Sequence, residues 1–370
     1  MHGIADEIIE RLKRIDGINA PHVSLGGKIQ AQAYDMDAYK IVADELLLAC
    51  KVKPLFHAIG TGVALRSDNA IEAVFVESKS GRAALRGRIF IDCSGDGDLA
   101  HWARAPYELG DGAGNMLYPS TKFRMANVDP KRAAGARELI PRLMEEAEKN
   151  GRVFPRRGAI VRQQRHPIEW SANATLIKNP DGLAVSGIDV EQMTYGEMEG
   201  RRQCLEMFEF FRSEAPGFEN AYIVDIAPQI GIRQTRRVTG EYRLSEADIL
   251  GCASFEDAIG VNGWPVEAHL ADRVLIKFAH IPESRGFNQL PYRMIVPQRI
   301  DNLLVAGRCA SMTHDGHSSA RVSGPCFAMG QAAGTAADLA LKAGVAPRAL
   351  DVRSLQQRLE KDGAYLGRDL

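Results

Sequence analysis

One segment toward the C-terminal end of the chain gathers side chains that can move protons and bind anions. It runs from Cys309 to Arg321 and contains His314 and His317. Histidine suits proton transfer because its pKa lies near neutrality, and the forked guanidinium of Arg321 suits an anionic group. We therefore predict His317, His314 and Arg321 as catalytic residues. Either histidine taken singly is more often a polar side chain of a solvent-exposed loop.

The same segment offers a second chemistry, metal binding through Cys309, His314 and His317. Three ligands on one flexible loop, without a shell of carboxylates, form a weak zinc pattern. No metal site is therefore predicted. A hydrolase built on this loop is kept as an alternative, and it would require bound metal.

A second group of arginines follows a predicted strand end. We predict that Arg233 and Arg236 bind substrate, because a guanidinium can hold a carboxylate through two parallel hydrogen bonds. Surface ion pairing with nearby acidic residues is the commoner use of arginine. A separate basic run, residues 152–165, lacks interleaved aromatic side chains and is interpreted as a solvated loop, not a nucleic-acid surface.

Two glycine-containing turns could bring backbone close to a ligand. Residues 95–100, Gly-Asp-Gly-Asp-Leu-Ala, match the dinucleotide fingerprint after a predicted strand. Asp92, Asp96 and Asp98 would meet a pyrophosphate there, so we predict a turn beside a ligand that is bound mainly by something else. The second turn opens a helix, with Gly324 as N-cap and Pro325 in the first helical position.

The helix after Pro325 carries mainly small side chains and ends near Gly344. Its free amide groups and positive dipole end favour a ligand atom that carries negative charge. Close packing in a core would also explain the small residues.

The elements that must position these residues are typical of an α/β protein. Apolar spacing predicts helices at 4–14, 35–50, 130–149, 194–212 and 325–342. Alternating or β-branched runs predict strands at 62–66, 70–77, 83–91, 174–177, 222–226 and 302–307. We expect one discontinuous domain at 1–110 and 286–350, a mixed α+β substrate or cap domain at 111–285, and a C-terminal tail helix in 351–370.

Composition and charge argue against several classes of protein. The chain has 370 residues, of which 45% are hydrophobic and 25% charged, and its formal net charge is -1. Such a balance creates no field that attracts nucleic acid or anionic lipid, and no apolar run is long enough to span a membrane. The six cysteines include no CxxC pair, which indicates free thiols in a reducing cytoplasm.

Three blocks of the sequence, in order, are familiar: residues 90–100 (FIDCSGDGDLA), 231–242 (GIRQTRRVTGEY) and 301–334 (DNLLVAGRC through QAAG). They resemble FAD-dependent oxidoreductases of the glutathione-reductase-like superfamily, and within it the group related to the flavin subunit of heterodisulfide reductase. The resemblance covers nearly the whole chain. It implies FAD at the boundary between a nucleotide-binding domain and a substrate domain.

By that likeness, Gly95 lies near the ADP half of FAD and Gly307 with Arg308 near the ribitol. The pyrimidine edge would face residues at the start of the last long helix, with two further cofactor contacts elsewhere. The predicted contacts at that helix are Gly324, Pro325, Cys326 and Phe327, and the two further ones are Asp96 and Ser311.

The resemblance also has a gap, because members open with a βαβ unit that carries GxGxxG and no such motif occurs before Met36. The expected fold is therefore an incomplete FAD/NAD(P)-binding domain with an inserted substrate domain. A truncated or late-started chain and a two-chain flavoprotein, whose partner supplies GxGxxG, both fit. The implied activity is hydride transfer between FAD and an unidentified small organic substrate, a carboxylate being one candidate. The alternative is a non-catalytic or partner-dependent subunit or fragment that does not bind FAD alone.

Overall fold

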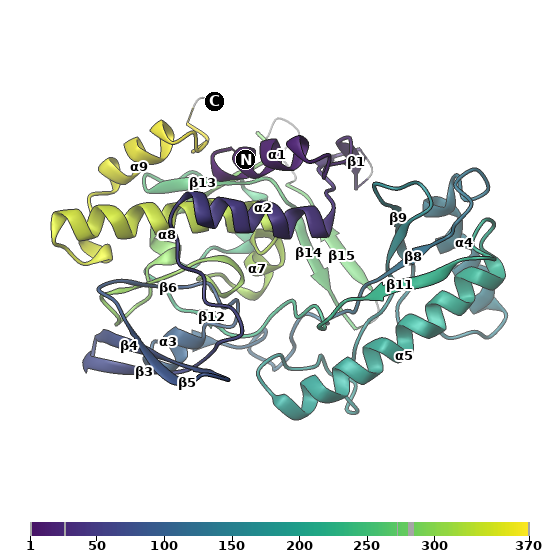
Figure 1. Cartoon of the computed structure of the whole chain (residues 1–370), viewed down its shortest axis with the longest axis horizontal. Coiled ribbons are helices and arrows are strands. Elements are labelled where there is room, and N and C mark those ends of the chain that lie inside the picture. Colours follow the sequence, from purple (N-terminus) through teal and green to yellow (C-terminus); the bar gives the residue numbers. More distant parts are fainter. Residues whose placement is uncertain (1, 26, 272, 280–284, 369–370) are drawn as a thin grey trace.

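The two largest apolar cores of the described residues lie in different parts of the fold, whose helices and strands are shown in Figure 1. The computed structural model describes residues 2–25, 27–271, 273–279 and 285–368. Its helices are α1 (Ile4–Arg14), α2 (Met36–Ala49), α3 (Asp98–Trp102), α4 (Ala136–Lys149), α5 (Val190–Glu214), α6 (Glu246–Leu250), α7 (His314–Ala320), α8 (Ser323–Ala343) and α9 (Val352–Lys361). Within the described part, no helix combines the length and apolarity that crossing a bilayer requires.

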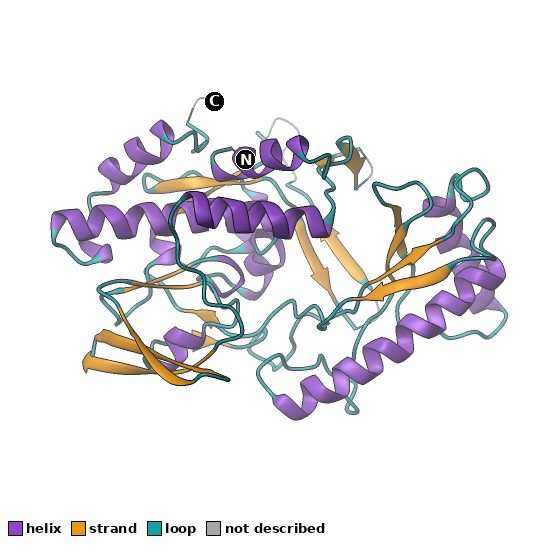
Figure 2. Cartoon of the chain, in the orientation of Figure 1, coloured by secondary structure: helices purple, strands orange, loops and turns teal. Residues whose placement is uncertain are grey.

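The strands are short and form several small sheets (Figure 2). They are β1 (His22–Ser24), β2 (Ile29–Ala31), β3 (Ile59–Ser67), β4 (Ala70–Ser78), β5 (Gly81–Arg86), β6 (Phe90–Asp92), β7 (Tyr107–Glu108), β8 (Phe123–Ala126), β9 (Ile160–Gln163), β10 (Trp170–Asn173), β11 (Tyr222–Ile226), β12 (Arg237–Val238), β13 (Ala258–Asn262), β14 (Val266–His269), β15 (Val274–Lys277), β16 (Asn288–Pro291) and β17 (Leu303–Val305). The three-stranded sheet β3-β4-β5 is an antiparallel meander.

The first core surrounds a parallel pair of strands, β6 and β17. Leu303 pairs with Phe90 and Val305 with Asp92, and all three residues of β17 are buried. Such burial suits parallel strands, which are covered on both faces. Because the carboxyl ends of parallel strands lie at one edge, the turns after Asp92 and after Val305 meet there.

Helix α8 packs against β13, β17 and α1, and its small side chains allow this close approach. Met329 and Ala333 are fully buried in the first core. Gln331 fixes α1 on the other side, because its side-chain oxygen accepts a hydrogen bond from the Ile4 amide at 3.0 Å. Helix α8 ends at Gly344 in the left-handed conformation, as the sequence predicts.

The second core lies between the four-stranded antiparallel sheet β11-β8-β10-β9 and helices α4 and α5 (Figure 1). It is rich in aromatic side chains, including Phe123 on β8 and Phe211 on α5, whose ring centroids are 6.2 Å apart. Its residues all lie within 123–221. The expected unit 111–285 is therefore larger than this core, because Val238 and Ile259 pack in the first core.

Several predicted boundaries are wrong for local reasons. Helix α4 begins at Ala136 and not at Pro130, because Gly135 adopts a φ of 85° and interrupts the turns before it. The strand predicted at 174–177 lies instead at β10, where Trp170 pairs with Met125. The predicted run 83–91 is two strands, since β5 pairs with β4 whereas β6 pairs with β17.

The segment predicted as a loop between Cys309 and Arg321 contains helix α7. Thr313 is its N-cap, and the Thr313 hydroxyl accepts a hydrogen bond from the Gly316 amide at 3.0 Å. After the C-cap at Arg321, helix α8 begins at Ser323 with Val322 as its N-cap. Gly324 and Pro325 therefore lie inside the first turn of α8, and the prediction of Gly324 as N-cap is wrong.

Two glycine-to-alanine substitutions should have opposite effects on the free energy of unfolding. Gly334 is exposed on α8 with open space around it, so Gly334→Ala should stabilise the chain by about 0.5–1 kcal/mol. Gly316 is buried in α7, and an added Cβ would overlap the Leu244 carbonyl oxygen. Gly316→Ala should cost roughly 1–3 kcal/mol. Urea denaturation measures both, and equal stability of the two variants would contradict this packing of α7.

Candidate functional site

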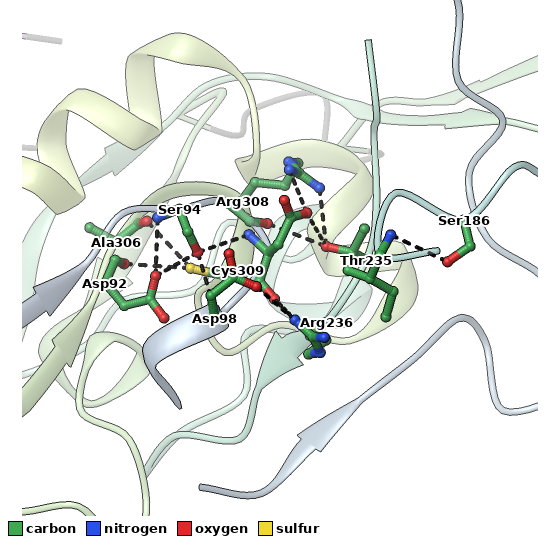
Figure 3. Close-up of polar contacts among 12 residues, drawn as sticks. Asp92, Ser94, Asp98, Ser186, Thr235, Arg236, Ala306, Arg308 and Cys309 are labelled. Atoms are coloured by element: carbon green, nitrogen blue, oxygen red, sulfur yellow. Dashed lines mark hydrogen bonds and ion pairs between the residues drawn. The ribbon is translucent and has the colours of Figure 1, made fainter. Parts of the chain in front are cut away.

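The turn after β6 is built around the buried carboxylate of Asp92 (Figure 3). One carboxylate oxygen accepts hydrogen bonds from the Ser94 amide at 3.0 Å and the Ser94 hydroxyl at 2.6 Å. The other accepts one from the Ala100 amide at 3.2 Å. Gly95 and Gly97 both have positive φ angles, which glycine adopts without steric cost. These contacts fix the backbone between β6 and α3.

A polar network joins this turn to the turn after β17 and to residues 235–236 (Figure 3). Arg308 donates hydrogen bonds to the Asp96 carboxylate at 2.8 Å and to the Thr235 hydroxyl at 3.2 Å. The Thr235 hydroxyl donates to Asp96 at 2.6 Å. A Cβ on Gly95 would lie 2.8 Å from a guanidinium nitrogen of Arg308. Glycine at this position therefore allows Arg308 to cross the turn.

Arg236, predicted as a substrate ligand, is engaged in the same network. It donates to the Asp96 carbonyl at 3.1 Å and pairs with the Asp98 carboxylate at 2.9 Å. Its guanidinium also lies 5.7 Å from the centroid of the Tyr107 ring. These contacts fix Arg236 to the turn and α3.

Helix α7 places His317 in a buried, electropositive environment. The side chain has no solvent exposure, and neither ring nitrogen has a hydrogen-bond partner among the described residues. Burial first, and then the charges of Arg321, Arg237 and Arg308, hold the pKa of His317 well below 6.5. The imidazole is therefore neutral at pH 7, and the interpretation of a solvent-exposed residue is wrong for His317.

His314 is half-buried on the same helix, three residues earlier. Its Nδ1 has no partner within the described structure. Burial lowers the pKa of His314, and the nearby Asp315 carboxylate opposes that shift. Both candidate histidines are therefore biased toward the neutral form.

Arg321 is the C-cap residue of α7. Its Nε is buried without a partner in the described part of the chain. Burial lowers the pKa of Arg321 to about 10, and the Glu267 carboxylate acts in the opposite direction. The backbone carbonyl of Arg321 accepts a hydrogen bond from the Cys326 thiol at 3.3 Å, and Gly307, with a φ of 84°, would place a Cβ 3.8 Å from the same sulfur.

The structure therefore brings together most of the residues that the sequence predicts for a cofactor. Gly307, Arg308, Arg321 and Cys326 lie around the start of α8, and Gly95 with Asp96 contact Arg308. Phe327 packs against the small apolar group of α1 and α2. Ser311 is buried, and its hydroxyl has no hydrogen-bond partner among the described residues. Gly324 and Pro325 lie in the first turn of α8.

Sequence reasoning missed a histidine–carboxylate pair on β14, which packs against α7. His269 Nε2 lies 3.2 Å from the Glu267 carboxylate, whose other oxygen accepts a hydrogen bond from the Trp264 indole at 2.9 Å. Burial lowers the pKa of His269, so that a neutral ring donates to Glu267. Burial acts to raise the pKa of Glu267, but its two hydrogen bonds and the charge of Arg321 lower it.

Arg233 connects this pair to the second lobe, by which we mean the part of the chain from about residue 117 to 226 that contains the second core. It donates to the Tyr118 carbonyl and to the Ser120 hydroxyl, the latter at 2.8 Å, while the Tyr118 amide donates to the His269 carbonyl at 3.0 Å. Burial, together with the charges of Arg321 and Arg156, lowers the pKa of Arg233 to about 9. The site is therefore positively charged, with Glu267 acting on Arg233, Arg321 and Arg156.

The burial of Arg156 contradicts the prediction that residues 152–165 form a solvated loop. Arg156 belongs to the basic run predicted as a solvated loop, yet only 8% of its surface is exposed.

No group of three or more His, Cys, Asp or Glu side chains within the described ranges is placed to hold a metal ion. The Cys309 sulfur instead lies 3.6 Å from the Asp92 carbonyl oxygen and 3.7 Å from that of Ala306, so its one S–H is shared between these two backbone acceptors.

Comparison with known proteins assigns the chain to a family. The model of the family described as FAD dependent oxidoreductase matches residues 1–359. The chain belongs to this family. FAD is therefore its cofactor. No curated protein matches the sequence significantly.

Several solved structures share distant similarity with this family member. A geranylgeranyl bacteriochlorophyll reductase-like protein from Thermoplasma acidophilum has 11% identity and a TM-score of 0.40, over 92% of this chain and 65% of that one. p-Nitrophenol 4-monooxygenase from Pseudomonas putida has 11% identity and a TM-score of 0.39, over 89% and 55%. The myxobacterial chondrochloren halogenase has 11% identity and a TM-score of 0.43, over 96% and 66%. The chain thus spans 65% and 55% of the length of the first two proteins.

The residues around α7 fit the flavin half of the FAD that this family uses. The isoalloxazine edge is rich in carbonyl and ring-nitrogen acceptors, and Arg321 Nε and one Arg237 nitrogen are buried donors without acceptors among the described residues. His317 adds a neutral ring that can donate through one nitrogen and accept through the other. Gly307 leaves the backbone open beside Cys326.

The pH dependence of stability should report the neutral state of His317. The unfolded chain takes up a proton at this histidine below pH 6.5, whereas the folded chain does not. Stability is therefore lost as pH falls through this window, by up to about 1.4 kcal/mol per pH unit. In His317→Gln, the free energy of unfolding should fall less steeply below pH 6.5. Urea unfolding from pH 7 to pH 5 tests this, and parallel curves would refute it.

Proposed function

We propose that this member of the FAD dependent oxidoreductase family transfers hydride between FAD and a small anionic organic substrate. The observation that carries the proposal is the group of buried donors without acceptors around Arg321 and His317. Unpaired buried polar groups cost free energy, so their clustering at one place is best explained by a bound acceptor. When bound there, FAD supplies a two-electron acceptor or donor for a substrate carbon.

Arg321 and Arg237 would hold the electron-rich edge of the ring system, as preorganised donors in a water-poor site. The first turn of α8, with Gly324 and Pro325, would add its positive dipole end. Gly307 and Arg308 would lie along the ribitol, and Arg308 keeps its orientation through Asp96 and Thr235. These roles rest on the arrangement of this chain's own residues.

Proton transfer to or from the substrate would fall to His269 or to the α7 histidines. His269 is held by Glu267, which is in turn held by Trp264; this arrangement orients the ring and supports a proton on it during the reaction. His317 is neutral and completely buried, so it suits a hydrogen bond to the ring system. Arg233 lies next to β14 and would bind a carboxylate of the substrate.

The two units of the chain would have different roles. A glutathione-reductase-like arrangement would make residues 1–110 and 286–350 the FAD-binding unit and 111–285 the substrate unit. The four-stranded sheet of the second lobe then covers the substrate side of Arg233. A βαβ unit with GxGxxG, on another part of a longer protein or on a second chain, would contact the ADP half.

Arg321 provides a test that separates ligand binding from folding. Arg321→Gln removes a cation whose buried Nε has no acceptor among the described residues, so the thermal midpoint of the FAD-free chain should stay the same or rise. Affinity for FAD should fall by about tenfold or more, because a charge-assisted hydrogen bond is lost. Titration of the chain with FAD, followed by flavin fluorescence, measures this change.

Arg353→Gln is the matched control, since Arg353 is exposed on α9, and its affinity for FAD should equal that of the natural sequence. Equal loss in both variants would contradict a specific role for Arg321. Absence of FAD binding by the natural sequence would favour the non-catalytic or partner-dependent subunit.

His269→Gln should separate the two candidate proton-transfer groups. Loss of a positioned general acid or base slows the chemical step by about 10²–10⁴-fold. Under anaerobic mixing with a panel of hydroxy acids and dicarboxylates, bleaching of the bound flavin should slow in His269→Gln. His314→Gln should change the rate far less, and the opposite order of effects would assign the proton to α7.

A further inference from the structure

A pocket of about 350 Å³ is lined by residues between 148 and 157 together with Lys178 and Ala271. Its charged lining comes from the end of α4, the segment that follows it and the stretch after β10: Glu148, Arg152, Arg156, Arg157 and Lys178. Its volume falls in the range of small-molecule sites, roughly 300–1,000 Å³. Four cations thus face one described carboxylate.

Arg152 and Arg156 are held in place by the fold. The Arg152 guanidinium lies 4.8 Å from the centroid of the Phe210 ring and 5.4 Å from that of Phe154; both rings belong to the second core. Such cation–π contacts orient a guanidinium and leave its edge free for an anion. Arg156 is more than nine-tenths buried at the pocket wall.

Arg156 is also without a partner. Among the described residues, its guanidinium makes no hydrogen bond and no ion pair, and Glu267 acts on it only at longer range. A buried charge without a hydrogen-bonded partner is costly. Lys178 and Arg157, on the same wall, likewise have no side-chain partner in the described ranges. The pocket therefore concentrates positive charge that the side chains of the described residues do not pair.

We propose that this pocket is a binding site for a small, multiply charged anion that bears phosphate or carboxylate groups. Arg156 would bind one negative group in the buried part of the pocket, and Arg152 and Lys178 would hold the remainder nearer the surface. The charge of Arg156 also acts on Arg233 of the candidate functional site. Binding of an anion in this pocket is nevertheless measured without flavin, so it is tested separately from the redox chemistry.

Pyrophosphate and citrate are suitable probes, one for each chemistry. Isothermal titration calorimetry at constant ionic strength should show saturable one-to-one binding of at least one of them. The thermal midpoint should rise with the concentration of that anion, as expected for a ligand of the folded state. Binding of pyrophosphate alone indicates a phosphate-bearing ligand, and binding of citrate alone indicates a polycarboxylate; either result supports the site.

Arg156→Gln should weaken the binding by about tenfold to a hundredfold, and its ligand-free thermal midpoint should equal or exceed that of the natural sequence. Arg142→Gln is the matched control, because Arg142 is exposed on α4 outside the pocket, and it should bind normally. If Arg156→Gln does not fold, Lys178→Gln provides the same comparison. Absence of saturable binding of both anions, or equal weakening in the pocket variant and the control, overturns the proposal.

Discussion

The parallel pairing of β6 with β17 is the constraint on which the rest of the site depends. It joins segments more than two hundred residues apart, and the hydrogen bond from the Cys309 thiol to the Asp92 carbonyl spans 217 positions. Each strand has only three residues, so the pairing alone cannot hold the segments. The Arg308–Asp96–Thr235 network completes the connection between the turns that follow the two strands. The buried Asp92 carboxylate fixes the turn between β6 and α3.

The small side chains of α8 serve packing and site geometry together. They let the helix approach β13, β17 and α1 closely, and this fixes where its first turn lies relative to Gly307. The chain passes from the C-cap of one helix to the N-cap of the next through adjacent residues, Arg321 and Val322, and this link points Arg321 into the buried region shared with Glu267 and His317.

Much of the local structure can be predicted from the sequence, because it depends on residues close together in the chain. Helices α1, α2 and α8 follow from apolar spacing, and β11 from its β-branched run. The pairing of Glu267 with His269 cannot be predicted in this way, because no local sequence pattern marks these two residues as partners. Their pairing depends on two side chains of one strand facing the same side and on burial by α7. The burial of Arg156 cannot be predicted either, because the basic residues around it in the sequence are typical of a solvated loop.

Electrostatics separates the groups that hold this fold together from those that await a ligand. The charges of Arg236 and Arg308 are paired with Asp98 and Asp96, which offsets their desolvation, while Arg236 Nε is buried without a partner among the described residues. Within the described part of the chain, Arg321 Nε is buried without a partner and the buried Arg156 makes no ion pair, while His317 stays neutral near Arg321. Filling these positions with apolar residues would remove that cost. Unpaired buried donors lower stability without improving packing. Such exceptions to the rule that buried polar groups are hydrogen-bonded are expected at binding sites. The pattern of unpaired charge therefore points to acceptors outside the chain.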